Sequence, residues 1–446
     1  MPRNSESVST KQERIAGLAK QSPEVAFTSL AYLMDIDWLK EAYRRTRKDG
    51  AVGVDGMNAD EYEQNLEANL QSLLDRAKSG TYQAPPVRRV YIPKGGSTTE
   101  TRPIGIPTLE DKVLQRAVVM LLGPIYEQDF LDCSYGFRPG RSAHQALEGF
   151  RSQLMDIKGG WVLEVDIRKF FDHLDHGHLR TFLQLRVRDG VLLRLINKWL
   201  KAGVMENGSV SYPDAGSPQG GVISPLLSNV FLHYVLDLWF EWDVKPRMRR
   251  EAFLIRYADD FVIGFSDERD ARRVMDVIPK RFAKYGLTAH PDKTKLVPFR
   301  RPSYRKDDDD KSSRPGTFNL LGFTHYWGRS RRGYWVIKLK TAADRFSRAV
   351  RSIDHWCRDH RHWSLREQQQ KLNEKLRGHF AYYGVTGNSG ALSRFRREVE
   401  RHWRKWLNRR NRLRTTKWKV FRRLLQKYPL IPVRTYRSIY RLAANP

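Results

Sequence analysis

Apolar residues recur along this chain with two spacings, and each spacing predicts its own kind of element. Apolar side chains at every third or fourth position predict amphipathic helices, and short runs of β-branched and aromatic residues predict strands. Residues 1 to about 25 are polar and are expected to be flexible. Helices are expected over residues 26–47, 59–78, 109–126, 179–201, 226–240 and 270–285, and extended segments over 82–107, 161–166, 253–265, 295–298, 318–323 and 333–339.

The pattern changes near residue 340. Beyond it, four helical segments follow one another with no strand between them, over residues 342–361, 365–383, 392–412 and 417–427. Strands mixed with helices, followed by helices alone, predict an α+β fold joined to an all-α module. The predicted domains are residues 1–50, 51–330 and 338–446.

Two adjacent carboxylates interrupt the apolar run FLIRYADDFVIGF. Asp259 and Asp260 lie at its centre, with strand-forming residues on both sides. This pattern predicts a β-hairpin whose tight turn presents both aspartates. Burying two like charges is costly without a compensating cation. The run therefore predicts a metal site on a hairpin.

A third carboxylate ends another short apolar run, WVLEVD, at Asp166. Phosphoryl transfer by two Mg²⁺ ions needs carboxylates from separate strands that converge on ions about 3.5 to 4 Å apart. Asp166 and Asp259, 93 residues apart, fit that requirement. Asp172 is a weaker candidate, and its expected role is to cap the helix or turn after the strand.

The charge of the chain predicts a polyanionic partner. The 446 residues carry a formal net charge of +30 with a pI of about 10.2. From Lys338 onward there are 29 Lys and Arg against 7 Asp and Glu, interleaved with Trp and Tyr. Such a surface is typical of contacts to phosphates and bases, and it is also compatible with basic amphipathic helices around aromatic cores. Nucleic acid is the expected partner.

Cysteine usage and hydropathy favour a cytoplasmic protein. Cys133 and Cys357 are the only cysteines, so neither a disulfide framework nor a structural zinc site is predicted. No run of about 18 apolar residues occurs, and the first residues lack the apolar centre of a secretory signal, so no membrane partner is expected. The acidic run 307–311 reads as a solvated loop and also matches a protease-recognition tag.

Several sequence blocks together resemble the reverse transcriptases encoded by bacterial group II introns. These blocks are RPIGIPTLEDKVLQRAV, CSYGFRPGRSAHQAL, DIRKFFD, SPQGGVISPLLSNVFLHYVLD, RYADDFVIGF, HPDKTK and NLLGF, over about residues 50–325. GVDGMNADEYEQNL resembles the N-terminal extension of that lineage, and LRGHFAYYGVTGN resembles its thumb and maturase domain. The resemblance implies a right-hand polymerase with fingers and an antiparallel palm sheet, followed by an all-α thumb and RNA-binding module.

The resemblance also implies a set of metal ligands. Asp166 and Asp259 would bind two Mg²⁺ ions, with Asp260 as the neighbouring carboxylate and the Ile167 carbonyl as a further ligand. Catalysis would then rest on these three aspartates, through positioning and electrostatic stabilisation.

Further residues match the family's contacts to nucleotide and primer. Cationic side chains at Lys94, Arg102 and Lys293 would meet the triphosphate. The alternative is that they are ordinary exposed basic residues, and this alternative has more weight for Lys293 than for Lys94 and Arg102. Phe171, five residues after Asp166, would exclude a ribose 2′-hydroxyl, whereas Phe170 is the expected core residue. Gln219 in the Pro-Gln-Gly loop would contact nucleotide and template. The segment Leu321, Gly322 and Phe323 resembles the primer grip.

The expected function is that of an RNA-directed DNA polymerase that binds its group II intron RNA, assists splicing and supports intron mobility. Its partners would be intron RNA, an RNA template with a DNA primer, a DNA target and dNTPs, with nucleoid association when bound to the target. The sequence does not fix an oligomeric state. No Cys-pair nuclease segment follows the maturase block, so second-strand cleavage is not expected. The alternatives are a polymerase-inactive splicing factor and a reverse transcriptase repurposed for host defence or CRISPR association.

Overall fold

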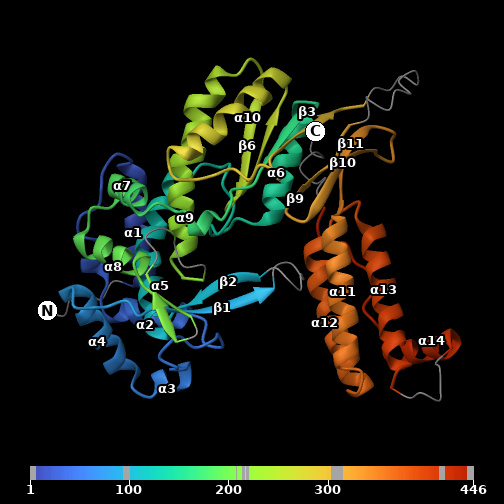
Figure 1. Ribbon diagram of the computed structural model, residues 1–446, viewed down its shortest axis with the longest axis horizontal. Coiled ribbons are helices and arrows are strands. Elements are labelled where there is room, and N and C mark those ends of the chain that lie inside the picture. Colours follow the sequence, from blue (N-terminus) through green and yellow to red (C-terminus); the bar gives the residue numbers. More distant parts are fainter. Residues whose placement is uncertain are drawn as a thin grey trace. The chain divides into compact units, whose positions relative to one another are not determined.

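The computed structural model describes residues 7–93, 101–206, 208–212, 216, 220–302, 315–410 and 417–438. The chain forms two compact units, which are described separately (Figure 1). The first contains residues 1–150 and 161–296, and the second contains residues 151–160 and 297–446. The fold is mixed α/β with antiparallel sheets and a helical C-terminal region, as predicted. Within the described ranges, none of the helices is long and apolar enough to cross a membrane.

The first described element is a helix where the sequence predicts a flexible segment, so that prediction is wrong for residues 8–21. Helix α1 (Val8–Gln21) starts after Ser7, whose hydroxyl caps the first turn. Ile15 and Ala19 are buried on one side of the helix, and most of its other side chains are polar. So few apolar positions gave only a weak helical period in the sequence.

Three of the predicted helices are divided in the structure. Residues 26–47, 59–78 and 179–201 each form two shorter helical segments. Asp189 starts the second segment of the last pair, because its carboxylate accepts hydrogen bonds from two backbone N–H groups of the next turn. The helices of this part of the chain are α1, η1 (Leu30–Leu33), α2 (Ile36–Arg45), α3 (Ala59–Glu63), α4 (Leu66–Ser79), α5 (Leu109–Asp129), α6 (Ala143–Asp156), η2 (Phe170–Asp172), α7 (His176–Arg186), α8 (Gly190–Leu200), α9 (Ser224–Leu232), the π-helical η3 (His233–Asp237) and η4 (Trp239–Val244), η5 (Lys245–Arg247) and α10 (Glu268–Ala283).

An antiparallel sheet in the first unit carries the predicted hairpin. Strand β7 pairs with β6 on one side, where Tyr257 lies opposite Asp260, and with β3 on the other, where Val165 lies opposite Phe261. Most side chains of these strands are buried, which explains their continuous apolar runs. The bounds are β3 (Gly159–Val165), β6 (Ala252–Tyr257) and β7 (Asp260–Phe265).

A second sheet of the first unit has the strand order β2-β1-β4-β5. β1 and β2 are antiparallel, which confirms the paired strands predicted within residues 82–107. β1 also pairs in parallel with β4. The bounds are β1 (Val87–Pro93), β2 (Thr101–Ile106), β4 (Val204–Glu206) and β5 (Ser209–Ser211).

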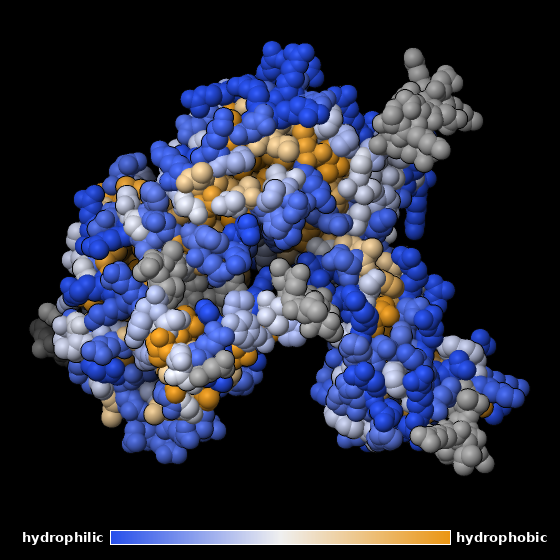
Figure 2. Space-filling model, in the orientation of Figure 1, coloured by the Kyte–Doolittle hydropathy of each residue, from blue (hydrophilic) through white to orange (hydrophobic). Residues whose placement is uncertain are grey.

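The second unit combines a three-stranded antiparallel sheet with the predicted helices. Trp403 and Phe421 are fully buried in the core that the helices share. Hydrophilic residues dominate the visible face of these helices (Figure 2). The elements are β9 (Phe318–Leu320), β10 (Phe323–Arg329), β11 (Trp335–Thr341), α11 (Ala343–Asp359), α12 (Leu365–Tyr383), α13 (Ser389–Leu407) and α14 (Trp418–Lys427), and β8 (Lys295–Arg300) crosses the boundary between the units.

Candidate active site

The turn between β6 and β7 presents Asp259 at the end of a hairpin. Ala258 and Asp259 connect the two strands, and Tyr257 pairs with Asp260 next to them. Ala258 has a φ of 58°, in the left-handed region that two-residue hairpin turns require. Asp259 is partly buried and Asp260 is exposed. The predicted hairpin and its tight turn are confirmed.

Asp166 directly follows β3 and lies beside this turn. The register of β3 on β7 makes Asp166 the next position opposite Asp260. The Asp166 carbonyl accepts a hydrogen bond from the His290 N–H at 2.7 Å. Ile167 forms an antiparallel bridge with Ala289. These backbone contacts fix both Asp166 and Ile167.

Lys293 reaches the same carboxylate. Its Nζ donates to Asp166 Oδ2 at 2.7 Å, and the two side chains are 53% and 31% exposed. Lys293 is therefore not a remote surface lysine, because its ammonium neutralises a carboxylate of the predicted metal site.

The two aspartates of the predicted metal site are electrostatically coupled. Burial raises the pKa of Asp259, the charge of Asp166 raises it further, and the guanidinium groups of Arg102 and Arg256 lower it. A divalent cation would relieve the repulsion between Asp166 and Asp259, and carboxylate oxygens are the donors that Mg²⁺ prefers. In the ranges the structure describes, no three His, Cys, Asp or Glu side chains form a complete ligand cluster. Backbone carbonyls, water and substrate phosphates would have to complete the coordination of an ion here.

The segment after β3 separates a core aromatic residue from a partly exposed one. Phe170 is buried and Phe171 is half-buried, with ring centroids 5.4 Å apart in an edge-on arrangement. Asp172 is exposed, and the cap of α7 is Asp175, which accepts a hydrogen bond from the His178 N–H at 2.7 Å. The capping role expected of Asp172 at this helix is therefore filled by Asp175.

The other predicted nucleotide contacts lie on β2 and on the glycine loop. Arg102 is exposed on β2, and its charge reaches Asp259. Gly220 in the loop has a φ of 120°, and a Cβ there would lie 2.3 Å from the Gly105 carbonyl oxygen. The loop backbone thus packs directly on β2, as only glycine permits. The predicted residues Lys94 and Gln219 lie outside the described residues.

The Leu-Gly-Phe segment forms a second tight turn, in the second unit. Leu321 and Gly322 connect β9 to β10 with φ values of 50° and 80°, the pattern of a type I′ hairpin turn. Tyr382 Oη donates to the Leu321 carbonyl at 2.8 Å. Phe323 is buried against the rings of Tyr382 and Tyr383. These two tyrosines therefore hold the segment predicted to be the primer grip.

Comparison with known proteins identifies both parts of the chain. The reverse transcriptase (RNA-dependent DNA polymerase) family matches residues 92–325, and the maturase-specific domain of group II introns matches residues 343–425. The chain belongs to the group II intron-encoded reverse transcriptases. It unites a reverse transcriptase domain with a maturase domain, the combination that acts in intron splicing and mobility.

Three relatives illustrate the range of similarity to this reverse transcriptase. Protein YkfC of Escherichia coli (strain K12) is 37% identical over 292 residues, which cover 57% of this chain and 75% of that protein. The group II intron-encoded protein LtrA of Lactococcus lactis is 28% identical over 450 residues, 86% of this chain and 75% of that protein. A 91 kDa protein in the cob intron of Schizosaccharomyces pombe is 25% identical over 458 residues, 88% of this chain and 55% of that protein.

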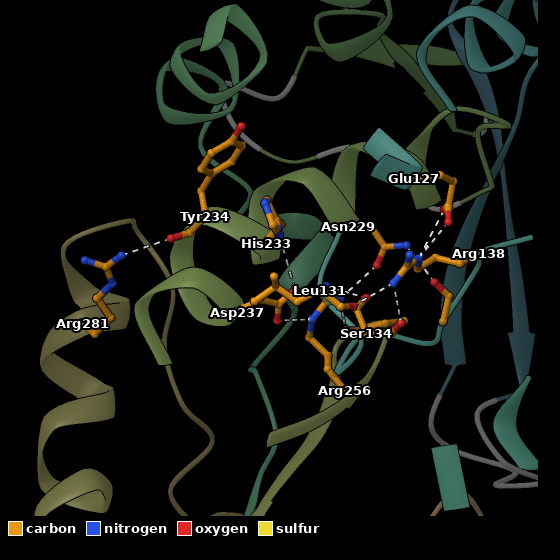
Figure 3. A network of polar contacts seen from close by, with 12 residues as sticks. Glu127, Leu131, Ser134, Arg138, Asn229, His233, Tyr234, Asp237, Arg256 and Arg281 are labelled. Carbon is orange, nitrogen blue, oxygen red and sulfur yellow. Dashed lines mark hydrogen bonds and ion pairs between the residues drawn. The ribbon is translucent and has the colours of Figure 1, made fainter. Parts of the chain in front are cut away.

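Sequence reasoning missed a buried arginine behind the Asp259 turn of this reverse transcriptase. Arg256 on β6 is fully buried and donates to Asp237, Asn229 and Ser134 and to the Ala258 carbonyl (Figure 3). The signal was present, because an arginine inside an otherwise apolar strand must find buried partners. The sequence alone did not indicate which residues those partners are.

The maturase domain of this reverse transcriptase carries a basic surface. On α13 four exposed basic side chains recur at helical spacing, and they lie on one side of the helix. The opposite side supplies Trp403 and Phe395 to the core. The expected aromatic core of basic amphipathic helices is confirmed for this helix, whose outer face is basic and is formed by Arg394, Arg397, Arg401 and Lys405.

Proposed function

We propose that this group II intron-encoded reverse transcriptase extends a DNA primer on an RNA template with two Mg²⁺ ions, held by Asp166 and Asp259 with Asp260 beside them. The observation that carries the proposal is geometric: β3 and β6 both pair with β7, so Asp166 at the end of β3 lies beside the turn that presents Asp259. Two carboxylates from different strands, kept close despite their repulsion, suit a divalent cation. The two sheets, the glycine loop and the helical module would be the palm, fingers and thumb of a right-hand polymerase.

Bound Mg²⁺ would lower the pKa of the primer 3′-hydroxyl and neutralise charge on the triphosphate. The residues of this chain would hold the reactants in line around it. Asp166 and Asp259 would orient the ions, and the Ile167 carbonyl would complete the site. Lys293, which now neutralises Asp166, would be released to the triphosphate once a cation compensates that carboxylate.

The remaining contacts select and align the substrate. Arg102 on β2 and Lys94 beyond β1 would donate to the triphosphate, and Gln219 would contact the new base pair. The half-buried ring of Phe171 would occupy the space of a ribose 2′-hydroxyl and so favour deoxynucleotides. The turn at Leu321 would present its backbone to the primer.

The basic face of α13 supports a second part of the proposal. It would contact phosphates of the intron RNA, whose binding the maturase domain implies. Reverse transcription of the intron at a DNA target would then follow from the same chain. The primer-extension chemistry and the RNA contact would involve residues of different units, so variants can separate them.

Primer extension on an RNA template, with a DNA primer, dNTPs and Mg²⁺, tests the catalytic assignment. Asp259→Ala should lower the rate by about 10³-fold or more, because charge stabilisation by metal ions is worth several kcal/mol. Asp132→Ala, at a carboxylate that is 93% exposed, should extend the primer like the wild type. Equal rates for Asp259→Ala and wild type would overturn the assignment. A wild type that binds intron RNA without extending any primer would favour the splicing-factor alternative.

A further inference from the structure

The Arg256 network consists of the side chains of Arg256, Asp237, Asn229 and Ser134 and the carbonyl of Ala258. Arg256 Nε and Nη2 donate to the two carboxylate oxygens of Asp237 at 2.7 and 2.5 Å. Nη1 donates to Asn229 Oδ1 at 2.9 Å and to the Ala258 carbonyl at 3.1 Å, and Nη2 donates to Ser134 Oγ at 2.8 Å. The side chains of Arg256 and Asp237 are both 0% exposed. The guanidinium is thus fully paired in the interior.

The network joins one helical stretch and one loop to strand β6 and the Asp259 turn that follows it. Figure 3 shows Asp237 and Asn229 reaching Arg256 from one helical stretch and Ser134 from a loop. Asn229 also donates from Nδ2 to the Gly136 carbonyl at 2.7 Å. A Cβ on Gly136 would lie 2.3 Å from the backbone nitrogen of Ala258. The loop that carries Ser134 therefore supports the residue directly before Asp259 as closely as backbone allows.

An irregularity in the helix fits this arrangement. Asn229 lies in α9, and Asp237 ends the π-helical segment η3 that follows it. In a regular α-helix, residues eight positions apart are rotated by about 80° around the axis. A π turn takes more residues than an α turn and brings Asp237 back towards the side of Asn229. Such π segments are frequent at functional sites.

Stability alone does not account for a buried ion pair here. Replacing such a pair by apolar residues of similar size is often neutral or stabilising, whereas removing one partner leaves a costly unpaired charge. Arg256 also contacts the turn directly, because its Nη1 donates to the Ala258 carbonyl.

We propose that Arg256 and Asp237 form a positioning pair, which fixes the Ala258 carbonyl so that Asp259 is held in the geometry that binds the divalent cation. The inference rests on the proposed metal site. Neither residue would touch the ion or the substrate. Loosening the pair should weaken cation binding while primer–template binding stays unchanged.

Mn²⁺ binding followed by electron paramagnetic resonance tests this without relying on turnover. The Arg256→Met/Asp237→Leu variant removes both charges together and avoids an unpaired one. We expect its Kd for Mn²⁺ to rise at least fivefold, and Arg256→Lys, which keeps the charge but not the fork of donors, to fall between it and the wild type. Primer–template affinity, measured by filter binding, should stay within twofold of the wild type.

A matched control exists in the same unit. Arg186 is also buried, although its pair is slightly more exposed, at 4% for Arg186 and 13% for Asp129. It donates to Asp129 at 2.8 Å and to backbone carbonyls of residues 19–25 rather than to the turn. Arg186→Met/Asp129→Leu should therefore leave the Kd for Mn²⁺ within twofold of the wild type. Circular dichroism melting would establish whether each variant is folded. If a double variant does not fold, the Kd of Arg256→Lys for Mn²⁺ alone tests the positioning role.

Two contrary outcomes differ from each other. If Asp259→Ala binds Mn²⁺ as tightly as the wild type, the metal site of the proposed function fails, and the positioning role fails with it. If Asp259→Ala loses Mn²⁺ but folded Arg256 variants bind it like the wild type, only the positioning role is overturned. An equal loss in the Arg186 control would also overturn that role, because the effect would then be one of general stability.

Discussion

Two tight turns of this chain have the same length and are held by different chemistry. Ala258 and Asp259 close the hairpin of the first unit, and Leu321 and Gly322 close a hairpin of the second. Both turns place a residue other than glycine in the left-handed region, at φ values of 58° and 50°. The first is backed by a buried arginine and its carboxylate, and the second by tyrosine rings and one hydroxyl.

The difference follows from what each turn presents. The first turn carries a carboxylate that must stay ionised beside another carboxylate, so cationic partners are needed around it. The second turn carries no ionisable side chain, and its backbone is the part proposed to meet the primer. Aromatic packing and a single hydrogen bond to the Leu321 carbonyl are enough to hold it. Charge compensation and shape are thus separate ways to stabilise a strained turn.

The largest expected effect concerns the charge balance at the first turn. Lys293→Gln removes the ammonium that bonds Asp166 in the free protein and is proposed to move to the triphosphate. It should lower kcat/KM for dNTPs by about 10- to 100-fold, because a hydrogen bond between charged groups is worth about 1.5 to 3 kcal/mol. Steady-state primer extension measures this. Lys295→Gln, at an exposed lysine two residues away, should have little effect. Equal losses in both variants would show that general charge, rather than the contact to Asp166, matters.

The second turn should respond to shape instead. Gly322→Ala places a Cβ at a φ of 80° and 2.9 Å from Tyr383 Oη, so the free energy of unfolding of this unit should fall by about 1 to 2 kcal/mol. Hydrogen exchange of β9 and β10 amides would report the loss locally. Gly333→Ala, also at positive φ but with open space around its Cβ, separates the clash from the backbone strain. Identical losses in both variants would mean that Tyr383 contributes nothing to the turn.

How much of these turns was predictable depends on how far apart their partners lie in sequence. The hairpin around Asp259 and the strand ending at Asp166 follow from local apolar patterns, and the structure confirms both. The partners of Arg256 do not follow from such patterns, since they lie 19, 27 and 122 residues away in Asp237, Asn229 and Ser134. A strand pattern shows that an arginine is buried without showing what pairs with it.

The prediction of two helical segments was wrong or incomplete for a related reason. The polar sequence of residues 8–21 forms a helix that docks on the rest of the unit through its buried residues Lys11, Ile15 and Ala19, and Lys11 is paired with Asp35. The sequence predicts the helix over residues 226–240 but not its π-helical part. Asp237 in that part pairs with Arg256 on β6, and this contact is not visible in the local sequence pattern. In both segments, residues distant in sequence rather than the local pattern determine the helical structure.

The pH dependence of activity should separate the turn at Asp259 from the turn at Leu321, because only the first carries an ionisable side chain. Because burial and Asp166 raise the pKa of Asp259, its carboxylate is lost on acidification at a higher pH than an ordinary aspartate would be. The cation binds the ionised form, so a tenfold rise in Mg²⁺ should move the acidic limb of the pH–rate profile down by up to about one pH unit. Rates measured at two Mg²⁺ concentrations test this. An acidic limb that ignores Mg²⁺ would exclude proton–metal competition at Asp259.

The smallest expected effect belongs to the hydroxyl behind the second turn. Tyr382→Phe removes the donor to the Leu321 carbonyl and keeps the ring against Phe323, so this unit should lose about 0.5 to 1.5 kcal/mol of stability. If the turn grips the primer, the variant should also release primer–template sooner, seen as shorter products under single-hit conditions, with no change in the Mg²⁺ dependence. Arg256 variants, in contrast, are expected to shift the Mg²⁺ dependence and to leave primer affinity unchanged. If Tyr382→Phe shifted the Mg²⁺ dependence and the Arg256 variants weakened primer binding, the division between a turn held by charge and a turn held by shape would be refuted.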